Sequence, residues 1–256
     1  MIEKRNWIEI KYAALKRKYL WLNSKKYQVK LVAEYPKSGG TWLTQMLGDL
    51  TDLHYYRNST PELKSCILHG HHNYNNCFYK PIFITRDYRD IIVSFYHHMI
   101  LGSFIPEKER IRNIKKIGIS DPSDVSFNLQ SFIDYLENKK RINLKKSSWT
   151  SMTKSYLNNI KKVHIVKYED LVDNPHKVLK ACIDFWGYSV SKNKIEKVIH
   201  KYDFKNQTKR GLGESKKGDF LRKGGYGDYK NYFSKDLSEK IFKENEYLFK
   251  LLDYEK

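Results

Sequence analysis

Three short apolar segments of this chain are each followed by residues at helical spacing, and this order constrains the fold more than any other feature. Val29–Glu34, Pro81–Thr85 and Lys162–Lys167 have the length and apolar character of buried strands. Strands that alternate with helices pair in parallel, because each crossover helix returns the chain to the same end of the sheet. The sequence therefore predicts an α/β fold with a central parallel sheet flanked by helices.

The helices of this pattern are defined by their apolar spacing. Thr41–Leu50 follows the first strand, Tyr88–Leu101 the second and His176–Trp186 the third. Pro175 precedes the last of these at a position where its missing N–H costs least. A final helix is expected over about residues 236–252.

The remaining segments have less regular patterns. Residues 1–28 are predicted to form a helical, lysine-rich lead-in, and residues 102–160 look more irregular. The residues from about 204 to 235 are rich in glycine, lysine and polar side chains, which indicates a long functional loop. No internal repeat or linker divides the chain, so residues 1–256 are predicted to form a single domain.

Composition narrows the class of protein without choosing a function. The formal net charge is +19, but lysine pairs are spread along the whole chain, which favours small anions over a nucleic-acid partner. The apolar runs are far too short to span a bilayer, and the first residues lack the apolar segment of a signal peptide. Cys66, Cys77 and Cys182 fit free thiols in a reducing compartment. A cytoplasmic protein without a membrane span is expected.

The turn between the first strand and its helix has the composition of an anion-binding loop. Its amides point outward at the positive end of a helix dipole, and its glycines allow a ligand to approach the backbone. A lysine supplies charge and two hydroxyls supply donors. The loop reads Tyr35-Pro36-Lys37-Ser38-Gly39-Gly40-Thr41-Trp42.

This loop differs from the loop of nucleoside triphosphatases. Those enzymes need GxxxxGK[ST], with the lysine after the last glycine, whereas Lys37 precedes Gly39 and Gly40. Taken alone, the octapeptide is also compatible with an ordinary glycine-containing strand-to-helix turn. Two other classes remain to be separated by binding assays: a P-loop nucleotide kinase, and a non-enzymatic nucleic-acid-binding protein suggested only by the charge.

Four segments, in order, resemble the cytosolic-type sulfotransferases that use 3′-phosphoadenosine 5′-phosphosulfate (PAPS). The loop resembles their YPKSGTTW phosphosulfate loop, and Arg86 with Ser94 eight residues later resembles their 3′-phosphate segment. Tyr168-Glu169-Asp170-Leu171 is similar to their YEDL segment, and residues 222–230 are similar to their RKGxxGDWK signature. The matches run from about residue 30 to 235. The sequence departs from the family at Gly40, where threonine is usual, and at Tyr229, where tryptophan is usual.

The resemblance implies a complete donor site with adenosine 3′,5′-bisphosphate as product. It places Lys37, Ser38, Gly39, Gly40 and Thr41 around the 5′-phosphosulfate, with Lys37 stabilising the leaving phosphate. It places the 3′-phosphate on five residues, namely Arg86, Ser94, Arg222, Lys223 and Gly224. It places the adenine on three aromatic residues, namely Trp42, Tyr168 and Phe204. About residues 204–235 would then cover the cofactor.

The base that takes the acceptor proton should be a histidine with a near-neutral pKa. The candidates are His69, His71 and His72, and on a strand His69 and His71 would share a face while His72 points away. The family has its histidine in a K-T-H-type segment at the end of a strand. This resemblance puts His71 in the base position and His69 where lysine is usual.

Two further interpretations concern the histidines and metals. Cys66, His69, His72 and Cys77 have zinc-like spacing, although Ile67 and Leu68 look like strand interior. No metal is expected, because lysine and backbone donors can meet the leaving group. His97 and His98 are interpreted as wall or packing residues and not as catalysts.

The predicted function is sulfuryl transfer from PAPS to a hydroxyl or amine, by in-line attack with a histidine base. A small-molecule acceptor is favoured, and glycan, lipid and peptide acceptors stay open. Nucleic acid is not an expected partner, and the oligomeric state is not predicted.

Overall fold

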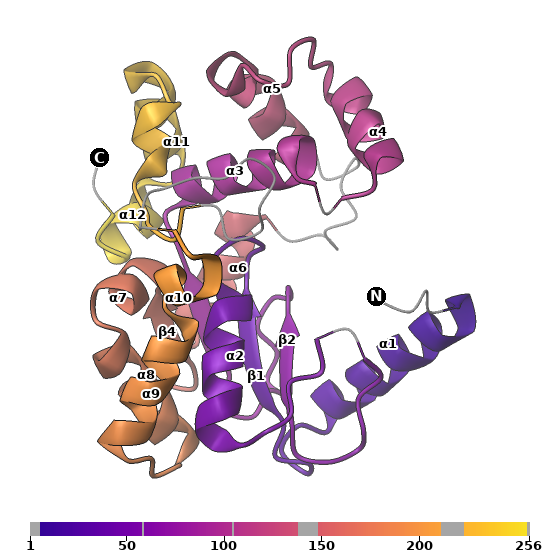
Figure 1. The fold of residues 1–256 in the computed structure, drawn as a ribbon, viewed down its shortest axis with the longest axis vertical. Helices are drawn as coiled ribbons and strands as arrows, with labels where there is room; N and C mark the ends of the chain where they lie inside the picture. The colour runs from indigo at the N-terminus through magenta and orange to yellow at the C-terminus, as the bar shows by residue number, and fades with distance from the viewer. Residues whose placement is uncertain (1–5, 58, 104, 138–147, 211–222, 255–256) are drawn as a thin grey trace.

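The chain is described by a computed structural model over residues 6–57, 59–103, 105–137, 148–210 and 223–254. Its centre is a four-stranded parallel sheet in the order β2-β1-β3-β4 (Figure 1). The strands are β1 (Lys30–Glu34), β2 (Ile67–Gly70), β3 (Ile82–Thr85) and β4 (His164–Lys167). The predicted α/β fold with a helix-flanked parallel sheet is confirmed.

The order of the strands creates a switch point between β1 and β3. The chain leaves β1 for β2 on one side and returns to pair β3 on the other side of β1. In open parallel sheets, ligands bind outside the carboxyl ends of the strands at such a point. Tyr35 follows β1 and Arg86 follows β3, so both lie at this crevice.

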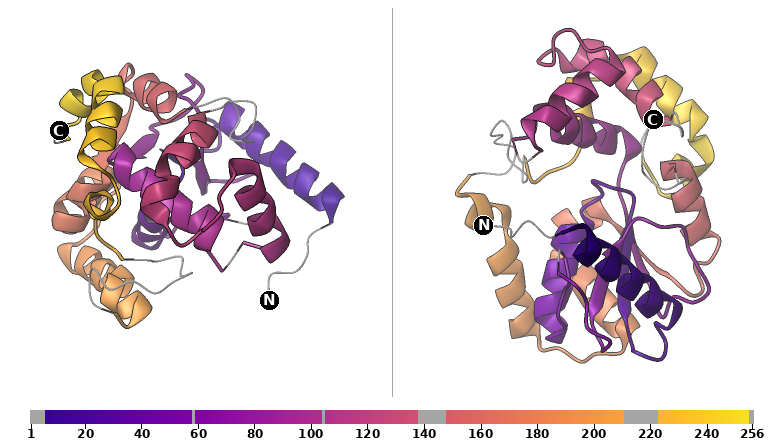
Figure 2. Two further views of the ribbon diagram at one scale, coloured as in Figure 1. Left: turned by 90° about the horizontal axis from the view of Figure 1, so that it is seen from above. Right: turned by 90° about the vertical axis from the view of Figure 1, so that its right-hand side faces the viewer.

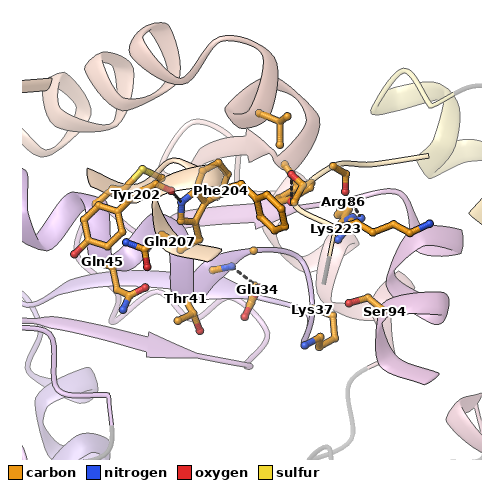
Figure 3. Close-up of a pocket in the computed structure, with 18 of the residues that line it drawn as sticks. Glu34, Lys37, Thr41, Gln45, Arg86, Ser94, Tyr202, Phe204, Gln207 and Lys223 are labelled. Atoms are coloured by element: carbon orange, nitrogen blue, oxygen red, sulfur yellow. Dashed lines mark hydrogen bonds between the residues drawn. The ribbon is translucent and has the colours of Figure 1, made fainter. Parts of the chain in front are cut away.

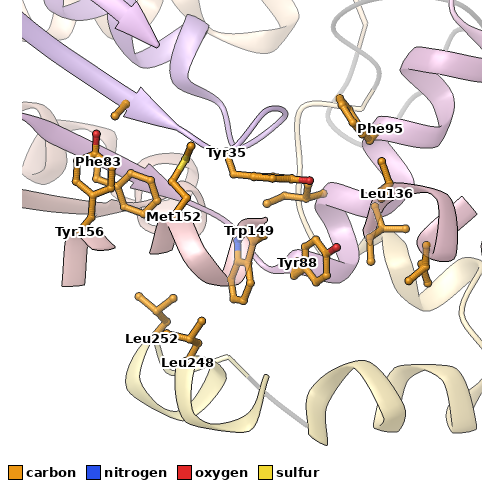
Figure 4. Packing of buried hydrophobic residues seen from close by; sticks show 14 of the residues in the cluster. Tyr35, Phe83, Tyr88, Phe95, Leu136, Trp149, Met152, Tyr156, Leu248 and Leu252 are labelled. Atoms are coloured by element: carbon orange, nitrogen blue, oxygen red, sulfur yellow. The ribbon is translucent and has the colours of Figure 1, made fainter. Parts of the chain in front are cut away.

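Alternate side chains of the strands enter two hydrophobic clusters, one on each face of the sheet. Val32 and Ile84 point to the face covered by α2 (Gly40–Thr51), α8 (Pro175–Trp186) and α9 (Lys192–Tyr202). Leu31, Ala33 and Phe83 point to the other face. There they meet a larger cluster that includes Tyr88, Trp149, Tyr156 and Leu248 (Figure 4). Figure 2 shows the ribbon of the helices and the sheet from two further sides.

Helices from distant parts of the chain build this larger layer. They are α1 (Trp7–Leu22), α3 (Tyr88–Tyr96) with its π-helical continuation (His97–Leu101), α4 (Glu107–Ile117), α5 (Val125–Glu137), α6 (Trp149–Leu157), α11 (Lys235–Glu244) and α12 (Glu246–Leu251). The expected final helix is interrupted at Asn245, which caps α11 and precedes α12.

The expectation of irregular structure over residues 102–160 was wrong, because α4, α5 and α6 lie there. The signals for α4 are present in the sequence: acidic residues in its first turn, lysines in its last turn and Gly118 as a left-handed C-cap. In α5, Val125, Leu129, Phe132 and Leu136 are buried at helical spacing.

The segment over residues 204–235 is only partly irregular. It begins with the short helix α10 (Phe204–Thr208) and contains a 3₁₀ turn (Asp228–Asn231). Arg222 lies outside the described residues, so its predicted role has no structural counterpart here. The remaining short helix, α7 (Tyr168–Asp173), carries the YEDL residues. None of the described helices is long and apolar enough to cross a membrane.

Candidate active site

A cavity of about 340 Å³ lies at the carboxyl ends of the strands. It is bounded by the loop after β1, by Arg86 after β3, by α3 and by residues 223–225. Figure 3 shows Lys37, Ser94, Arg86 and Lys223 at one end of it. Gln45, Tyr202 and Gln207 lie at the other end (Figure 3).

The loop after β1 has the backbone of an anion site. Lys37 and Gly39 have left-handed φ values of 78° and 98°, and α2 begins at Gly40 without a side-chain cap. A side chain at position 39 would also meet the ring of Tyr168, since an added Cβ would lie 2.6 Å from it. Lys37, Gly39, Gly40 and Thr41 all line the cavity.

Ser38 is placed differently from its neighbours in the loop. It is fully buried, its Oγ has no hydrogen-bond partner among the described residues, and it does not line the cavity. Its hydroxyl therefore lies behind the loop, and a role toward a bound anion needs a small rearrangement.

Glu34, the last residue of β1, is a buried acid that the sequence analysis did not single out. Its carboxylate accepts hydrogen bonds from the Gly40 N–H (2.6 Å) and from His69 Nε2 (2.9 Å). Burial by itself would raise the pKa of Glu34, but the hydrogen bond and charge of His69 lower it below its ordinary value. The Glu34 side chain is thus held as a carboxylate beside the phosphate loop.

Gly40 leaves the space that Glu34 and His69 occupy. A Cβ at position 40 would lie 2.6 Å from Glu34 Cδ and 2.7 Å from His69 Nε2. Two of the departures from the family pattern, glycine at 40 and histidine at 69, are therefore in contact with each other through Glu34. The Gly40 amide is also committed to Glu34 rather than directed at a ligand.

His71 presents one ring nitrogen to the cavity. Its Nδ1 donates to the backbone carbonyl of Glu34 at 3.0 Å, which leaves Nε2 as the acceptor in this tautomer. Desolvation by the surrounding protein lowers the pKa of His71, and the charge of His69 lowers it further. The charge of Glu34 acts in the opposite direction, but the pKa stays below its ordinary value. A neutral imidazole with an open lone pair has the properties of a base.

The other two candidate histidines differ from His71. His69 lies 5.0 Å from His71 between ring centroids, but its Nε2 contacts Glu34. His72 turns away and packs on Trp21, with centroids 4.0 Å apart. The expectation that His69 and His71 share a face while His72 points away matches this arrangement.

The cationic end of the cavity contains Lys37, Ser94 and His98. Lys37 comes from the loop and Ser94 from α3, and both line this end of the cavity (Figure 3). Burial and the charge of Lys37 lower the pKa of His98 to about 4, so His98 is neutral. His98 forms part of the cavity wall, as expected from the sequence.

Arg86 is buried and joins the strand end to the segment after residue 222. Its Nη2 donates to the Gly225 carbonyl (3.1 Å), and it pairs with Asp90 (3.3 Å). Burial would lower the pKa of Arg86, but Asp90 raises it, so the guanidinium stays charged. Its Nε has no hydrogen-bond partner among the described residues, which leaves a donor for a bound anion.

Asp90 fixes the glycine-rich segment beside Arg86. Its carboxylate accepts from the amides of Gly227 (2.6 Å) and Tyr229 (3.0 Å). Lys223 lines the cavity and pairs with Asp228 of the same segment. Tyr229, where the family has tryptophan, packs its ring against Arg89 at 4.1 Å.

The three aromatic residues expected near adenine lie together. Trp42 and Tyr168 meet edge to face at 6.1 Å, and the Tyr168 hydroxyl donates to the Gly224 carbonyl. Gly224 has a φ of 72°, and an added Cβ would lie 2.4 Å from the ring of Phe204. All three aromatic side chains line the cavity, so the described part of the predicted donor site converges there except for Ser38.

Gln45, Tyr202 and Gln207 are lining residues that the sequence analysis missed. Gln45 lies one helical turn after Trp42, and this spacing could have indicated it. Tyr202 accepts the Trp42 indole N–H through its carbonyl at 3.0 Å, a contact between segments 160 residues apart that no local pattern shows.

Only one group among the described residues offers three clustered metal-ligand atoms, namely Glu34, His69 and His71 within 4.8 Å of one another. Glu34 and His69 already hydrogen-bond each other, so the pair is satisfied without an ion. The zinc-like set of the sequence does not form: Cys66 is fully buried, whereas Cys77 is exposed.

The fold and this cavity define a phosphate-loop α/β protein with a basic, aromatic-lined site at its switch point. Residues 75–253 match the family described as the sulfotransferase domain. The bovine (Bos taurus) sulfotransferase 1E1 is 25% identical over 260 residues, covering 82% of this chain and 80% of the relative. A flavonol 3-sulfotransferase of Flaveria bidentis is 24% identical over 264 residues, covering 83% and 78%.

Solved structures have the same fold. Mouse sulfotransferase SULT7A1 complexed with PAP superimposes with a TM-score of 0.62 at 18% identity, covering 91% of this chain and 88% of that one. Retinol dehydratase with retinol and PAP gives 0.62 at 16% identity, covering 89% and 84%. The chain belongs to the sulfotransferase domain family, and the resemblance seen in its sequence is confirmed. It is an enzyme of sulfuryl transfer.

Proposed function

We propose that this enzyme binds PAPS in the cavity and transfers its sulfuryl group to a hydroxyl or amine of a small molecule, with His71 as base. The observation that carries the proposal is the convergence of the Lys37 loop, Arg86, Lys223 and the aromatic residues on one cavity. The relatives complexed with PAP are consistent with such a ligand.

The donor would lie along the length of the cavity. Lys37 and the loop amides other than that of Gly40 would hold the 5′-phosphosulfate, and Arg86, Ser94, Lys223 and Gly224 would hold the 3′-phosphate. Trp42, Tyr168 and Phe204 would contact the adenine, since stacking on aromatic rings stabilises a base by about 1–3 kcal/mol. Two anion subsites with an aromatic region distinguish this donor from ATP.

In the reaction, the acceptor oxygen or nitrogen attacks sulfur in line. The bond from sulfur to the bridging oxygen breaks, and adenosine 3′,5′-bisphosphate leaves with the electron pair. Lys37 would neutralise this leaving phosphate, and His71 Nε2 would take the acceptor proton. These groups balance the charge without a metal, and activity should survive removal of divalent ions with a chelator.

Three further parts of the proposal concern the acceptor, the domain and the location. A flavonol sulfotransferase among the relatives favours a small-molecule acceptor over a glycan, lipid or peptide. One cluster contains both Leu20 and Tyr254, so the chain would act as one catalytic unit. The three cysteines are free thiols, which supports a cytoplasmic location.

Thermal melting with ligands tests the donor assignment. Adenosine 3′,5′-bisphosphate at a hundred times its Kd should stabilise the protein by about 2.7 kcal/mol, whereas adenosine 5′-phosphate and ATP should give a much smaller effect. Arg86→Ala should weaken this binding at least tenfold. Equal stabilisation by ATP would favour a nucleotide kinase, and an unchanged affinity in Arg86→Ala would contradict the 3′-phosphate role.

A further inference from the structure

Helix α1 carries an apolar stripe that faces away from the rest of the protein. Ile8, Tyr12, Leu15, Tyr19 and Leu22 follow one another at spacings of four and three, which places them on one side of the helix. They are 43–70% exposed. Figure 1 shows α1 extending outward from the sheet. Single exposed apolar residues are common on protein surfaces, but a continuous apolar stripe along a helix indicates an interaction site.

The opposite side of α1 holds the helix in place. Ala13 and Leu20 are buried, and Leu20 belongs to the larger hydrophobic cluster. Between them, Arg17 donates to the carbonyls of Tyr56 (2.8 Å) and Ser59 (2.7 Å). These contacts orient the helix so that its apolar stripe faces solvent.

Lysines flank the stripe on both sides. At 100° per residue, Lys11 and Lys18 follow one edge and Lys16 lies on the other. Lys11 Nζ lies 3.8 Å above the ring of Trp7, and Lys16 Nζ lies 5.1 Å from the ring of Tyr12. Their charged ends are thus at the border of the apolar surface, where long cationic side chains can reach an adjacent polar layer.

These charges argue against a second copy of the chain as the partner. The spacing is that of a coiled-coil seam, but the flanking positions carry Lys11, Lys16 and Lys18. In a parallel or an antiparallel pair, these lysines would face one another. The one acid of α1, Glu9, forms a capping box with Asn6 at the start of the helix. The face therefore suits an anionic partner.

We propose that α1 binds the surface of a bilayer that contains anionic lipids. The stripe would enter the boundary between headgroups and acyl chains, and the lysines would meet lipid phosphates and carboxylates. The tyrosines in the stripe and Trp7 beside it suit this interface, because their rings are apolar and their edges polar. The net charge of +19 adds attraction over a longer range.

Sedimentation with vesicles tests the lipid surface directly. The full chain should bind vesicles of phosphatidylcholine with phosphatidylserine at least tenfold more strongly than vesicles of phosphatidylcholine alone. Ile8→Ser, Leu15→Ser and Leu22→Ser combined should lower this binding about tenfold or more. Phe127→Ser is the matched control, since Phe127 is 77% exposed on α5. Circular dichroism and thermal melting should show both variants folded as the wild type.

A second pair of variants separates a local surface from overall charge. Lys11→Glu, Lys16→Glu and Lys18→Glu combined should abolish the preference for phosphatidylserine. A control with the same change in net charge carries glutamate at three exposed lysines of α4, namely Lys108, Lys115 and Lys116, and should bind within about threefold of wild type.

Three outcomes would overturn the proposal. Equal losses in the two lysine variants would assign vesicle binding to overall charge. A wild-type dimer in equilibrium sedimentation that Leu15→Ser dissociates would assign the stripe to self-pairing. No vesicle binding at all would leave an acidic segment of another protein as the partner.

Discussion

Gly40 and Glu34 touch at the start of α2, and the contact makes each residue depend on the other. Gly40→Ala should destabilise the protein by about 1–3 kcal/mol, because the new methyl group overlaps Glu34 and His69 in a packed region. Gly48→Ala on the same helix should be neutral or stabilising by up to about 1 kcal/mol, since its nearest contact is 3.4 Å away. Urea denaturation of both variants measures the difference.

A double-mutant cycle with Glu34→Ala tests whether the overlap is the cause. Shortening Glu34 removes its share of the overlap and leaves only the contact with His69, so the Gly40→Ala penalty should shrink by about 1 kcal/mol or more in that background. The same penalty in both backgrounds would mean that His69 or the conformation of the loop, and not Glu34, requires glycine at position 40.

His71 offers a second test at the scale of one residue. His71→Ala should lower kcat about 10²–10⁴-fold, because a positioned base contributes this much, and should leave the Kd of adenosine 3′,5′-bisphosphate within about twofold. His72→Ala is the matched control, since its ring packs on Trp21 outside the cavity. Near wild-type turnover of His71→Ala would reassign the base.

The pH profile gives an independent reading of His71. Desolvation by the surrounding protein lowers the pKa of His71 from its ordinary value of 6.5, so the neutral base persists below that pH. The acidic limb of kcat/KM should accordingly lie below about pH 6.5, with activity lost as the pH falls through it. The limb should be absent in the residual activity of His71→Ala.

Single residues of the site were predictable where one segment carries the chemistry. Lys37 and Thr41 could be identified because a strand, glycines and a helix surround them in the sequence. Glu34 could not, because its partner His69 is brought to it by the register that pairs Val32 with His69. A charged residue at the end of an apolar strand was the one local signal for Glu34.

At the scale of elements, α7 holds a titratable group behind the site. Glu169 accepts the Asp87 amide at 3.1 Å, and burial raises its pKa to about 7 from an ordinary 4.5. The folded state therefore binds this proton more tightly than the unfolded state does. The contribution of this proton to the unfolding free energy is fully present below about pH 4.5 and is lost as the pH rises through about 7. It amounts to on the order of 3 kcal/mol.

Glu169→Gln should remove the loss of stability that the wild type shows as the pH rises. The unfolding free energy of the variant should exceed that of the wild type above pH 7 by up to about 3 kcal/mol, and the two free energies should converge near pH 4.5. Denaturant titrations from pH 4.5 to 8 measure the difference. The exposed neighbour substitution Asp170→Asn should leave the pH profile unchanged. Parallel profiles for wild type and Glu169→Gln would show that Glu169 is ionised throughout.

The elements themselves were predictable in proportion to their periodicity. The strands β1, β3 and β4 are apolar runs between turn residues, and α2 and α8 have clear apolar stripes. The helices α4 and α5 were missed although the C-cap of α4 and the apolar spacing of α5 are present in the sequence; in α4 the charged residues outweigh the apolar ones. The short α7 and α10 each contain one aromatic residue with a tertiary contact, Tyr168 to Gly224 and Phe204 beside Gly224, and the Asp203 side chain also caps α10.

The whole molecule combines a high positive charge with a site for a polyanionic donor. Raising the ionic strength from about 20 to about 200 mM shortens the range of that charge to roughly 7 Å. Association of PAPS should therefore slow, and kcat/KM for PAPS should fall about three- to tenfold. The chemical step occurs inside the cavity, so kcat should change less than about twofold.

An uncharged acceptor supplies the internal control, because its KM should not follow the salt concentration. Lys37→Ala should lower kcat severely and keep the same relative dependence of kcat/KM on salt, since the spread charge and not Lys37 guides the donor. Duplex DNA should bind weakly, because no single stripe of the surface concentrates the charge. Tight DNA binding at physiological salt that survives Lys37→Ala would instead give the charge a nucleic acid as its partner.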